Sequence, residues 1–303
     1  MKKYCCKHSQ DDIPHDTTHL KFIKEFNDVV DLSHLTSITH ITFGWFYNQP
    51  VTLPPNITHL TFKGEFNQFI SYFPPTITHL TFGHAYDQPT TQLPQSITHL
   101  TFGDRYNQPN TQLPSSITHL IFGHEYNQTT HLPQSITHLT FGNDYNQPTN
   151  LPSNITHLTF GNYYNQPTDL PATITHLDFG WFYNRPLILP PSIISLKLGH
   201  HYNQPTIFPH SIKTLEFGYF YHQPTTLPPF LIKFKVYNHN FISYKHQLMN
   251  NHHLTNVFIF DLDVRAHTET NKYNISQKSS TLQSLCLSYE TAILICVLPL
   301  NKH

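Results

Sequence analysis

Histidine is the residue type whose spacing in this sequence could do chemistry. The chain has 25 histidines. Nine of them recur at the third position of a repeated I-T-H-L-T-F-G segment: His19, His40, His59, His79, His99, His119, His138, His157 and His176. Imidazoles in a regular column can ligate zinc or nickel, but a zinc site normally needs three or four converging ligands, and the flanking threonines supply none of the preferred type. We therefore predict no specific metal site and keep a metal-responsive histidine column as the alternative hypothesis.

Catalytic patterns do not recur in the sequence. No carboxylate pair, nucleophile beside a base or phosphate-binding glycine loop stands out, and the histidine segments lack Asp or Ser at a fixed partner position. We therefore expect a protein that is not an enzyme and needs no cofactor.

Composition excludes several other classes. The 303 residues include 17 Lys and Arg against 18 Asp and Glu, so charge indicates neither nucleic acid nor a membrane as a partner. The first residues have no apolar core of a secretory signal, and the apolar tract Ala292–Leu298 is too short to cross a bilayer, so we expect a buried cap strand there. An intracellular, cytoplasmic protein with reduced cysteines is predicted.

A repeat of 19 or 20 residues organises the chain. Its consensus is I-T-H-L-T-F-G-x-x-Y-N-Q-P-T-x-L-P-x-S, with copies that begin at Ile38, Ile57, Ile77, Ile97, Ile117, Ile136, Ile155, Ile174, Ile193 and Ile212. Weaker copies begin at Thr17 and Leu231, and cap units are expected at Leu254 and Leu282. These boundaries predict an N-terminal extension or cap over 1–16, a repeat solenoid over 17–236, and degenerate repeats with a cap or partly flexible tail over 237–303.

Within one copy the apolar spacing predicts a short strand. Ile57, Leu60 and Phe62 point inward, so His59 and Thr61 point outward. Prolines in most copies, followed by a Leu-Pro or Phe-Pro pair, forbid a helix on the return path. Because one copy buries too little apolar surface to fold alone, successive copies must stack. The sequence therefore predicts an all-β, parallel-stranded solenoid of about twelve coils with extended, non-helical return segments.

Stacking turns each conserved offset into a column of equivalent residues. The asparagines of the Y-N-Q-P blocks should form a ladder that satisfies turn backbone groups in neighbouring coils. The histidines should form an exposed ladder that packs edge to face, with pKa values below the ordinary value of about 6.5. The glycine that ends each strand indicates a positive φ or a close approach of neighbouring coils, and Lys63-Gly64 indicates a local bulge.

The two positions after each of these glycines vary most. Aromatic residues there are candidates for interface anchors: Trp45, Phe46, Tyr163, Trp181, Phe182, Tyr219 and Phe220. The candidate partner-binding surface combines them with the outward histidines His99, His119, His138, His157 and His176. The alternative is that one aromatic ring of each pair only packs against the adjacent coil.

The repeat resembles a known family. Phe26-Asn27, Phe66-Asn67-Gln68 and the repeated Y-N-Q-P, L-P and I-T-H-L-T-F-G blocks are similar to FNIP repeats over Thr17–Val236. This resemblance implies a leucine-rich-repeat-like solenoid, occurrence in amoebae or in the large viruses that infect them, no enzymatic activity in the repeats, and a surface that recognises ubiquitin-ligase substrates. The sixteen residues ahead of the repeats are too few for an F-box, so we expect the recognition half alone.

Three functional hypotheses follow from the sequence. The first is a non-catalytic scaffold that recognises an unidentified protein partner through the strand face and the adjacent aromatic positions. The second is metal-responsive binding by the histidine column. The third is inert structural mass left by recent duplication. The sequence leaves the partner's identity and the oligomeric state open.

Overall fold

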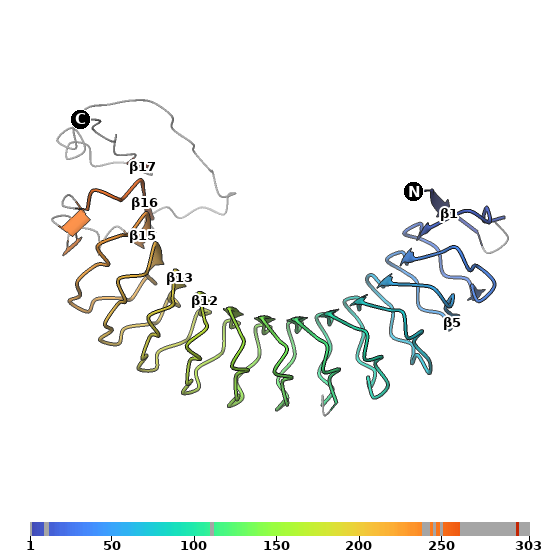
Figure 1. Ribbon diagram of the computed structural model, residues 1–303, viewed down its shortest axis with the longest axis horizontal. Coiled ribbons are helices and arrows are strands. Elements are labelled where there is room, and N and C mark those ends of the chain that lie inside the picture. The colour runs from blue at the N-terminus through green and yellow to red at the C-terminus, as the bar shows by residue number, and fades with distance from the viewer. Residues whose placement is uncertain are drawn as a thin grey trace. The chain divides into compact units, whose positions relative to one another are not determined.

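A computed structural model describes residues 2–8, 12–109, 112–237, 243–244, 247–248, 251–260 and 295–296. The chain divides into two compact units, Met1–Pro171 and Ala172–His303, here called unit 1 and unit 2. In both units each coil contributes a short strand on one side and an extended return segment on the other (Figure 1). This arrangement confirms the predicted parallel-stranded solenoid. The only helical residues in the described part of the chain lie at 243–244 and 247–248.

Unit 1 contains nine strands in one parallel sheet. They are β1 (Lys3–Cys6), β2 (His19–Phe22), β4 (His40–Thr42), β6 (His59–Thr61), β7 (His79–Thr81), β8 (His99–Thr101), β9 (His119–Ile121), β10 (His138–Thr140) and β11 (His157–Thr159). Two further strands, β3 (Val30–Asp31) and β5 (Val51–Thr52), pair with each other on return segments. Strand β1 pairs in parallel with β2 and extends the sheet ahead of the first recognisable repeat.

Unit 2 continues the same design with β12 (His176–Asp178), β13 (Ser195–Lys197), β14 (Thr214–Glu216), β15 (Lys233–Tyr237) and β16 (Asn256–Phe260). Neighbouring strands from β12 to β16 pair in parallel. Strand β17 (Ile295–Cys296) pairs with β16 in the antiparallel sense. The predicted cap unit at Leu254 thus forms β16, and part of the predicted cap strand forms β17. The remainder of that tract, the cap unit at Leu282 and the polar stretch at 271–280 lie outside the described residues.

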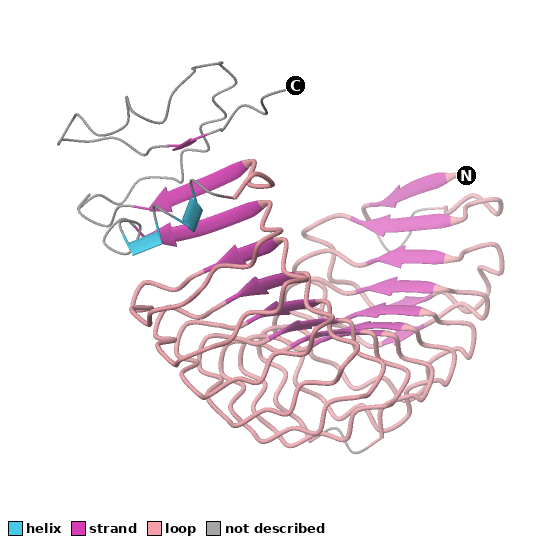
Figure 2. Ribbon diagram, turned by 60° about the vertical axis from the view of Figure 1, so that its left-hand side comes forward, coloured by secondary structure: helices cyan, strands magenta, loops and turns pink. Residues whose placement is uncertain are grey.

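The strands of each unit lie side by side, and their register is set by the repeat (Figure 2). In unit 1, His59, Leu60 and Thr61 pair with His79, Leu80 and Thr81. Equivalent residues therefore meet in every coil, and one column of side chains runs along each offset.

Four apolar columns form the core. In the coil that begins at Ile117, the side chains of Ile117, Leu120, Phe122 and Tyr126 are all at most 2% exposed. The rings of Phe122 and Tyr126 stack with centroids 3.9 Å apart. The alternation predicted from the sequence is confirmed, because the Ile, Leu and Phe offsets are buried and the His and Thr offsets between them reach the surface.

Asparagine side chains bond successive coils at the turn. Oδ1 of Asn107 accepts hydrogen bonds from the backbone N–H of Asn127 at 3.0 Å and from Nε2 of Gln128 at 3.1 Å. Asp87 does the same for Asn107 and Gln108, at 3.0 Å in both cases. The predicted asparagine ladder is confirmed. Each of these bonds needs an acceptor oxygen in the side chain at this position, which Asn and Asp both supply.

Close approach of neighbouring coils explains the glycine at the strand end. A Cβ on Gly103 would overlap the carbonyl oxygen of Gly83 in the preceding coil. Gly64 is different because its φ is +39°, in the left-handed region that favours glycine. The irregularity predicted at Lys63-Gly64 therefore appears in the backbone, whereas close packing alone accounts for glycine at Gly103.

The asparagine ladder generates a stability prediction. Asn107→Ala removes the acceptor for two donors of the next coil, so we expect a loss of about 1–2 kcal/mol in the free energy of unfolding, measured by urea denaturation. Asn107→Asp keeps the oxygen in the manner of Asp87 and should unfold close to the unchanged protein. Equal midpoints for the alanine variant and the unchanged protein would contradict the role of the ladder.

Candidate functional site

Eight histidines of unit 1 form a continuous stack on the strand face. From His19 to His157, ring centroids of neighbouring coils lie 4.0–4.2 Å apart, and the ring planes are within 10–13° of parallel. The predicted edge-to-face packing is wrong. Strand pairing brings identical side chains with identical rotamers into register, and planar rings so placed can only lie face to face.

The same histidines are half-buried and are held by threonine. Oγ1 of Thr58 lies 2.9 Å from Nδ1 of His59, and it also lies 3.1 Å from the backbone carbonyl oxygen of Thr39 in the preceding coil. A hydroxyl has one proton, so when Thr58 donates to that carbonyl, Nδ1–H of His59 donates to the hydroxyl. The outward Nε2 is then an acceptor. The same contact recurs at His99, His119, His138 and His157, and in unit 2 at the exposed His176.

Burial favours the neutral form of several of these rings. Burial lowers the pKa of His59 to about 4, with a smaller contribution from repulsion by the neighbouring imidazoles. The pKa values of His40, His79 and His99 are also lowered, first by burial and then by neighbouring histidines. The predicted direction is confirmed for these four, although burial rather than mutual repulsion is its main cause.

The stack does not make a metal site of the ordinary kind. Because neighbouring rings are nearly parallel, their outward Nε2 lone pairs run side by side and do not converge on one point, as a tetrahedral zinc site requires. Among the residues that the structure describes, no group of three or more His, Cys, Asp or Glu side chains is placed to hold a metal ion.

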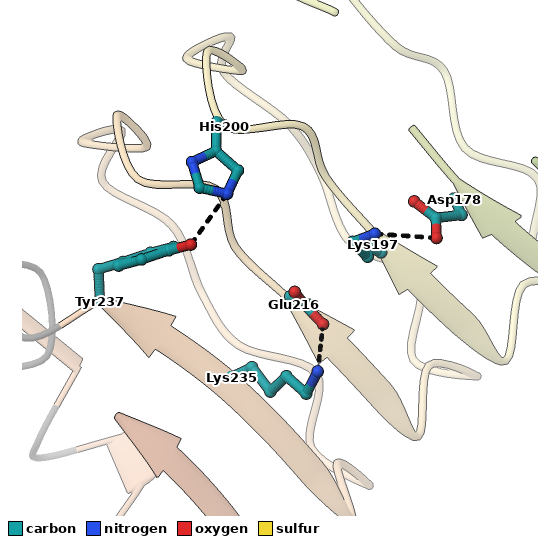
Figure 3. A network of polar contacts seen from close by, with 6 residues as sticks. All are labelled: Asp178, Lys197, His200, Glu216, Lys235 and Tyr237. Carbon is teal, nitrogen blue, oxygen red and sulfur yellow. Dashed lines mark hydrogen bonds and ion pairs between the residues drawn. The ribbon is translucent and has the colours of Figure 1, made fainter. Parts of the chain in front are cut away.

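Unit 2 presents charged residues at the offset that threonine occupies in most of unit 1. Asp178, Lys197, Glu216 and Lys235, here called the charge ladder, follow one another along β12 to β15. Nζ of Lys197 lies 3.0 Å from Oδ2 of Asp178, and Nζ of Lys235 lies 2.8 Å from Oε2 of Glu216 (Figure 3). Burial raises the pKa of Asp178, and the Lys197 ammonium opposes that rise. The charges of the ladder alternate in sign and thus form two ion pairs on the strand face.

Aromatic side chains gather where the strands of unit 2 end. This cluster, here called the aromatic edge, consists of Trp181, Phe182, His200, His201, Tyr219, Phe220 and Tyr237. The Trp181 ring stacks on His200 at 3.9 Å and 10°. The ring of His201 lies between Phe182 and Phe220, with centroids 5.0 and 4.9 Å away. Trp181, Phe182 and Phe220 remain 45%, 40% and 42% exposed. The rings thus pack on the adjacent coil and still face solvent, and their role as interface anchors stays a prediction.

A hydrogen bond joins two members of the aromatic edge, Tyr237 and His200. Oη of Tyr237, at the end of β15, lies 2.9 Å from Nε2 of His200 (Figure 3). Burial lowers the pKa of His200 and raises that of Tyr237 to about 12. Both groups are therefore neutral at physiological pH, so the hydroxyl and the imidazole form an uncharged hydrogen bond.

In the described part of unit 1, the predicted pair Trp45 and Phe46 does not form a comparable cluster. Trp45 and Phe46 are about as exposed as the equivalent pair in unit 2. The Lys24 ammonium lies 5.5 Å from the centroid of the Phe46 ring, and the Trp45 side chain covers the backbone of Gly64. Tyr163 is 52% exposed near the end of unit 1.

Sequence reasoning missed three members of the aromatic edge: His200, His201 and Tyr237. A signal existed for two of them, because His200 and His201 occupy the variable positions after Gly199. Tyr237 carried no such signal, since it lies in a degenerate copy that lacks the consensus glycine.

Comparisons with known proteins agree with the fold. A family model of the FNIP repeat matches residues 47–85, 86–125, 126–150, 145–182 and 183–220. The crystal structure of CroV588, described as a novel circular LRR protein, is similar with a TM-score of 0.68 and 38% sequence identity over 74% of this chain. The match covers 37% of the CroV588 chain, so this chain spans well under half of its length. YopM from Yersinia enterocolitica gives a TM-score of 0.47 at 16% identity over 75% of this chain and 66% of its own. None of the curated proteins that were compared matches.

The lowered histidine pKa values predict a stability that depends on pH. The unfolded chain has imidazole pKa values near 6.5, above those of His40, His59, His79 and His99 in the folded state. Below about pH 6.5 the unfolded chain therefore binds more protons, so stability is greatest above that pH and falls as the pH drops toward the folded values. We expect a lower Tm at pH 5 than at pH 7 by differential scanning calorimetry.

A variant isolates the contribution of the stack. His59→Phe keeps a flat ring in the column but removes one titrating group, so its Tm should change less between pH 7 and pH 5. A Tm that is the same at both pH values in the unchanged protein would contradict the half-buried, neutral stack.

Proposed function

Because the chain belongs to the FNIP-repeat family, we propose that it is a protein-interaction scaffold that binds a partner through the strand face and the aromatic edge. The observation that carries the proposal is the cluster of half-exposed rings, with Trp181, Phe182 and Phe220 each at least 40% exposed. Aromatic side chains with large accessible area are the residues that dominate binding free energy at protein interfaces. Leucine-rich-repeat-like solenoids commonly bind proteins, since stacked coils give a continuous surface.

The strand face suits this task because its scaffold is regular. In most copies similar backbone bonds and the same buried columns fix the coil, and the two positions after the glycine vary most. A side chain can therefore be replaced at those positions without disturbing the core. This division supports a recognition surface in which Trp45, Phe46, Tyr163 and the outward histidines are secondary contacts.

The proposal involves no enzymatic step. The ubiquitin-ligase role, as the substrate-recognition half of an adaptor, remains the specific form of the hypothesis and rests on the family resemblance alone. No helix in the described part of the chain is both long and apolar enough to span a membrane. The cytoplasmic location also remains a prediction.

The metal-responsive alternative has less support. The parallel orientation of the imidazoles from His19 to His157 separates their outward lone pairs, whereas zinc requires convergent ligands. Calorimetry with Zn²⁺ at neutral pH separates the hypotheses: stoichiometric micromolar binding would favour the metal-responsive protein over the scaffold.

Affinity capture from an amoebal lysate tests the scaffold proposal. We expect a partner captured by the intact protein to be lost from the double variant Trp181→Ala/Phe182→Ala, because two aromatic anchors are truncated. The matched control is Ile188→Ala/Ile207→Ala, which removes two side chains that are 92% and 93% exposed on return segments of unit 2.

The control should capture the partner as the unchanged protein does. Capture that is insensitive to the Trp181/Phe182 variant but lost in the Ile188/Ile207 variant would move the binding surface to the return side.

A further inference from the structure

The rings of the aromatic edge pack against one another, and this packing covers part of their faces. One face of Trp181 lies on His200, and His201 is flanked by Phe182 and Phe220. Rings that stack along a column direct their edges toward solvent. The hydrogens at an aromatic edge carry partial positive charge, whereas the π face is negative. The exposed rim of this cluster therefore favours groups rich in oxygen and negative charge.

In this part of unit 2, positively charged residues also outnumber acidic ones. Residues 172–237 contain five Lys or Arg and two Asp or Glu. Both of those carboxylates, Asp178 and Glu216, are engaged by lysine at 3.0 and 2.8 Å. The charge ladder is therefore balanced within itself, and the excess of positive charge in this segment comes from Arg185, Lys213 and Lys233.

Unit 1 has the opposite balance. Residues 1–171 contain seven Lys or Arg and 12 Asp or Glu. Its positions after the glycines include Glu65, Asp104, Glu125 and Asp144, against one cation at Arg105. An anionic segment is therefore repelled by unit 1 and attracted to unit 2, so that charge alone discriminates between the two surfaces.

We propose that the aromatic edge of unit 2, together with the lysines of the charge ladder, binds an acidic, extended segment of a protein partner. The proposal rests on the proposed scaffold function and specifies the chemistry of the partner. Aspartate and glutamate side chains of the segment lie against Lys197, Lys235 and the ring edges, and its apolar side chains contact the exposed area of Trp181, Phe182 and Phe220.

Other ligands fit this surface less well. A lysine or methyl-lysine side chain requires an open aromatic face, whereas one face of Trp181 lies on His200 and the ring of His201 lies between Phe182 and Phe220. Single-stranded nucleic acid also binds by stacking bases on open ring faces, so the same geometry disfavours it. The experiment below therefore includes these competing ligands as probes.

Direct binding of four probes tests the proposal. The probes are fluorescein-labelled nine-residue peptides that alternate leucine with glutamate, with glutamine or with lysine, and a nine-nucleotide oligo(dT). Fluorescence anisotropy at low salt should show the glutamate peptide binding at least about tenfold more tightly than the lysine peptide, with an affinity that falls as salt is raised.

Variants test whether the glutamate peptide binds to unit 2. Lys197→Gln/Lys235→Gln and Trp181→Ala/Phe182→Ala should each weaken binding of the glutamate peptide by about fivefold or more. Ile188→Ala/Ile207→Ala is the control, since it removes two exposed side chains from the return segments of unit 2 and should leave the affinity unchanged. In a Trp45→Phe background Trp181 is the sole tryptophan, and its fluorescence should change on titration with the glutamate peptide.

Several results would overturn the proposal: preference for the lysine peptide or oligo(dT), binding of the glutamate peptide that survives the unit 2 variants, or no binding of any probe. None of these results decides whether the protein is a scaffold, because the affinity capture described above tests that function separately. If capture depends on Trp181 and Phe182 while the glutamate peptide does not bind, the scaffold stands and the acidic partner is wrong. Self-association of the protein that competes with the glutamate peptide would identify a second copy as the ligand and would also overturn it.

Discussion

Hydrogen bonding between successive coils is the constraint on which this structure depends. Within each unit the strands of successive repeats pair in parallel, and an Asn or Asp oxygen in the turn accepts a hydrogen bond from a backbone N–H of the following coil. A coil of 19 or 20 residues cannot bury enough apolar surface to fold alone, so its backbone groups must be satisfied by its neighbours. Because this bonding repeats at a fixed offset, every side chain sits beside its equivalent in the adjacent coil. The stacked Tyr, Phe and His columns are the result.

The same bonding between coils divides the residues into those that hold the fold together and those that are available for recognition. The offsets that bond or bury are occupied by the same residue types in nearly every copy, whereas the positions after the glycine are free to differ. Unit 2 uses that freedom for aromatic rings, whereas unit 1 mixes charged, polar and aromatic residues. On the strand face, outward threonine in most of unit 1 gives way to the ion-paired Asp178, Lys197, Glu216 and Lys235 in unit 2. One backbone design thus supports two surfaces of different chemistry, and the proposed binding of an acidic segment depends on that difference.

Much of the fold could be predicted from the sequence, because offsets in a repeat translate directly into columns. The inward Leu60 and Phe62, the outward His59 and Thr61, the non-helical return path and the asparagine ladder all follow from spacing and proline placement. Other features depend on geometry that spacing does not contain. The face-to-face stacking of His59 on His79 follows from the identical rotamers that strand register imposes. Strand β1 and Tyr237 lie in segments without the consensus, so no pattern indicated β1 or the contact between Tyr237 and His200. The candidate aromatic residues could be selected by position, but only the structure distinguishes the cluster around Trp181 from the separate pair at Trp45.

Amide hydrogen exchange, followed by mass spectrometry or NMR, tests the central claim most directly. If the coils are bonded to one another as described, the strand amides of Leu80, Leu100 and Leu120 and the turn amides of Asn67, Asn107 and Asn127 should exchange slowly, while amides in the return segments exchange faster. Rapid exchange at the turn amides, or protection that is uniform around each coil, would contradict a solenoid held together by coil-to-coil bonds at the strand and the asparagine ladder.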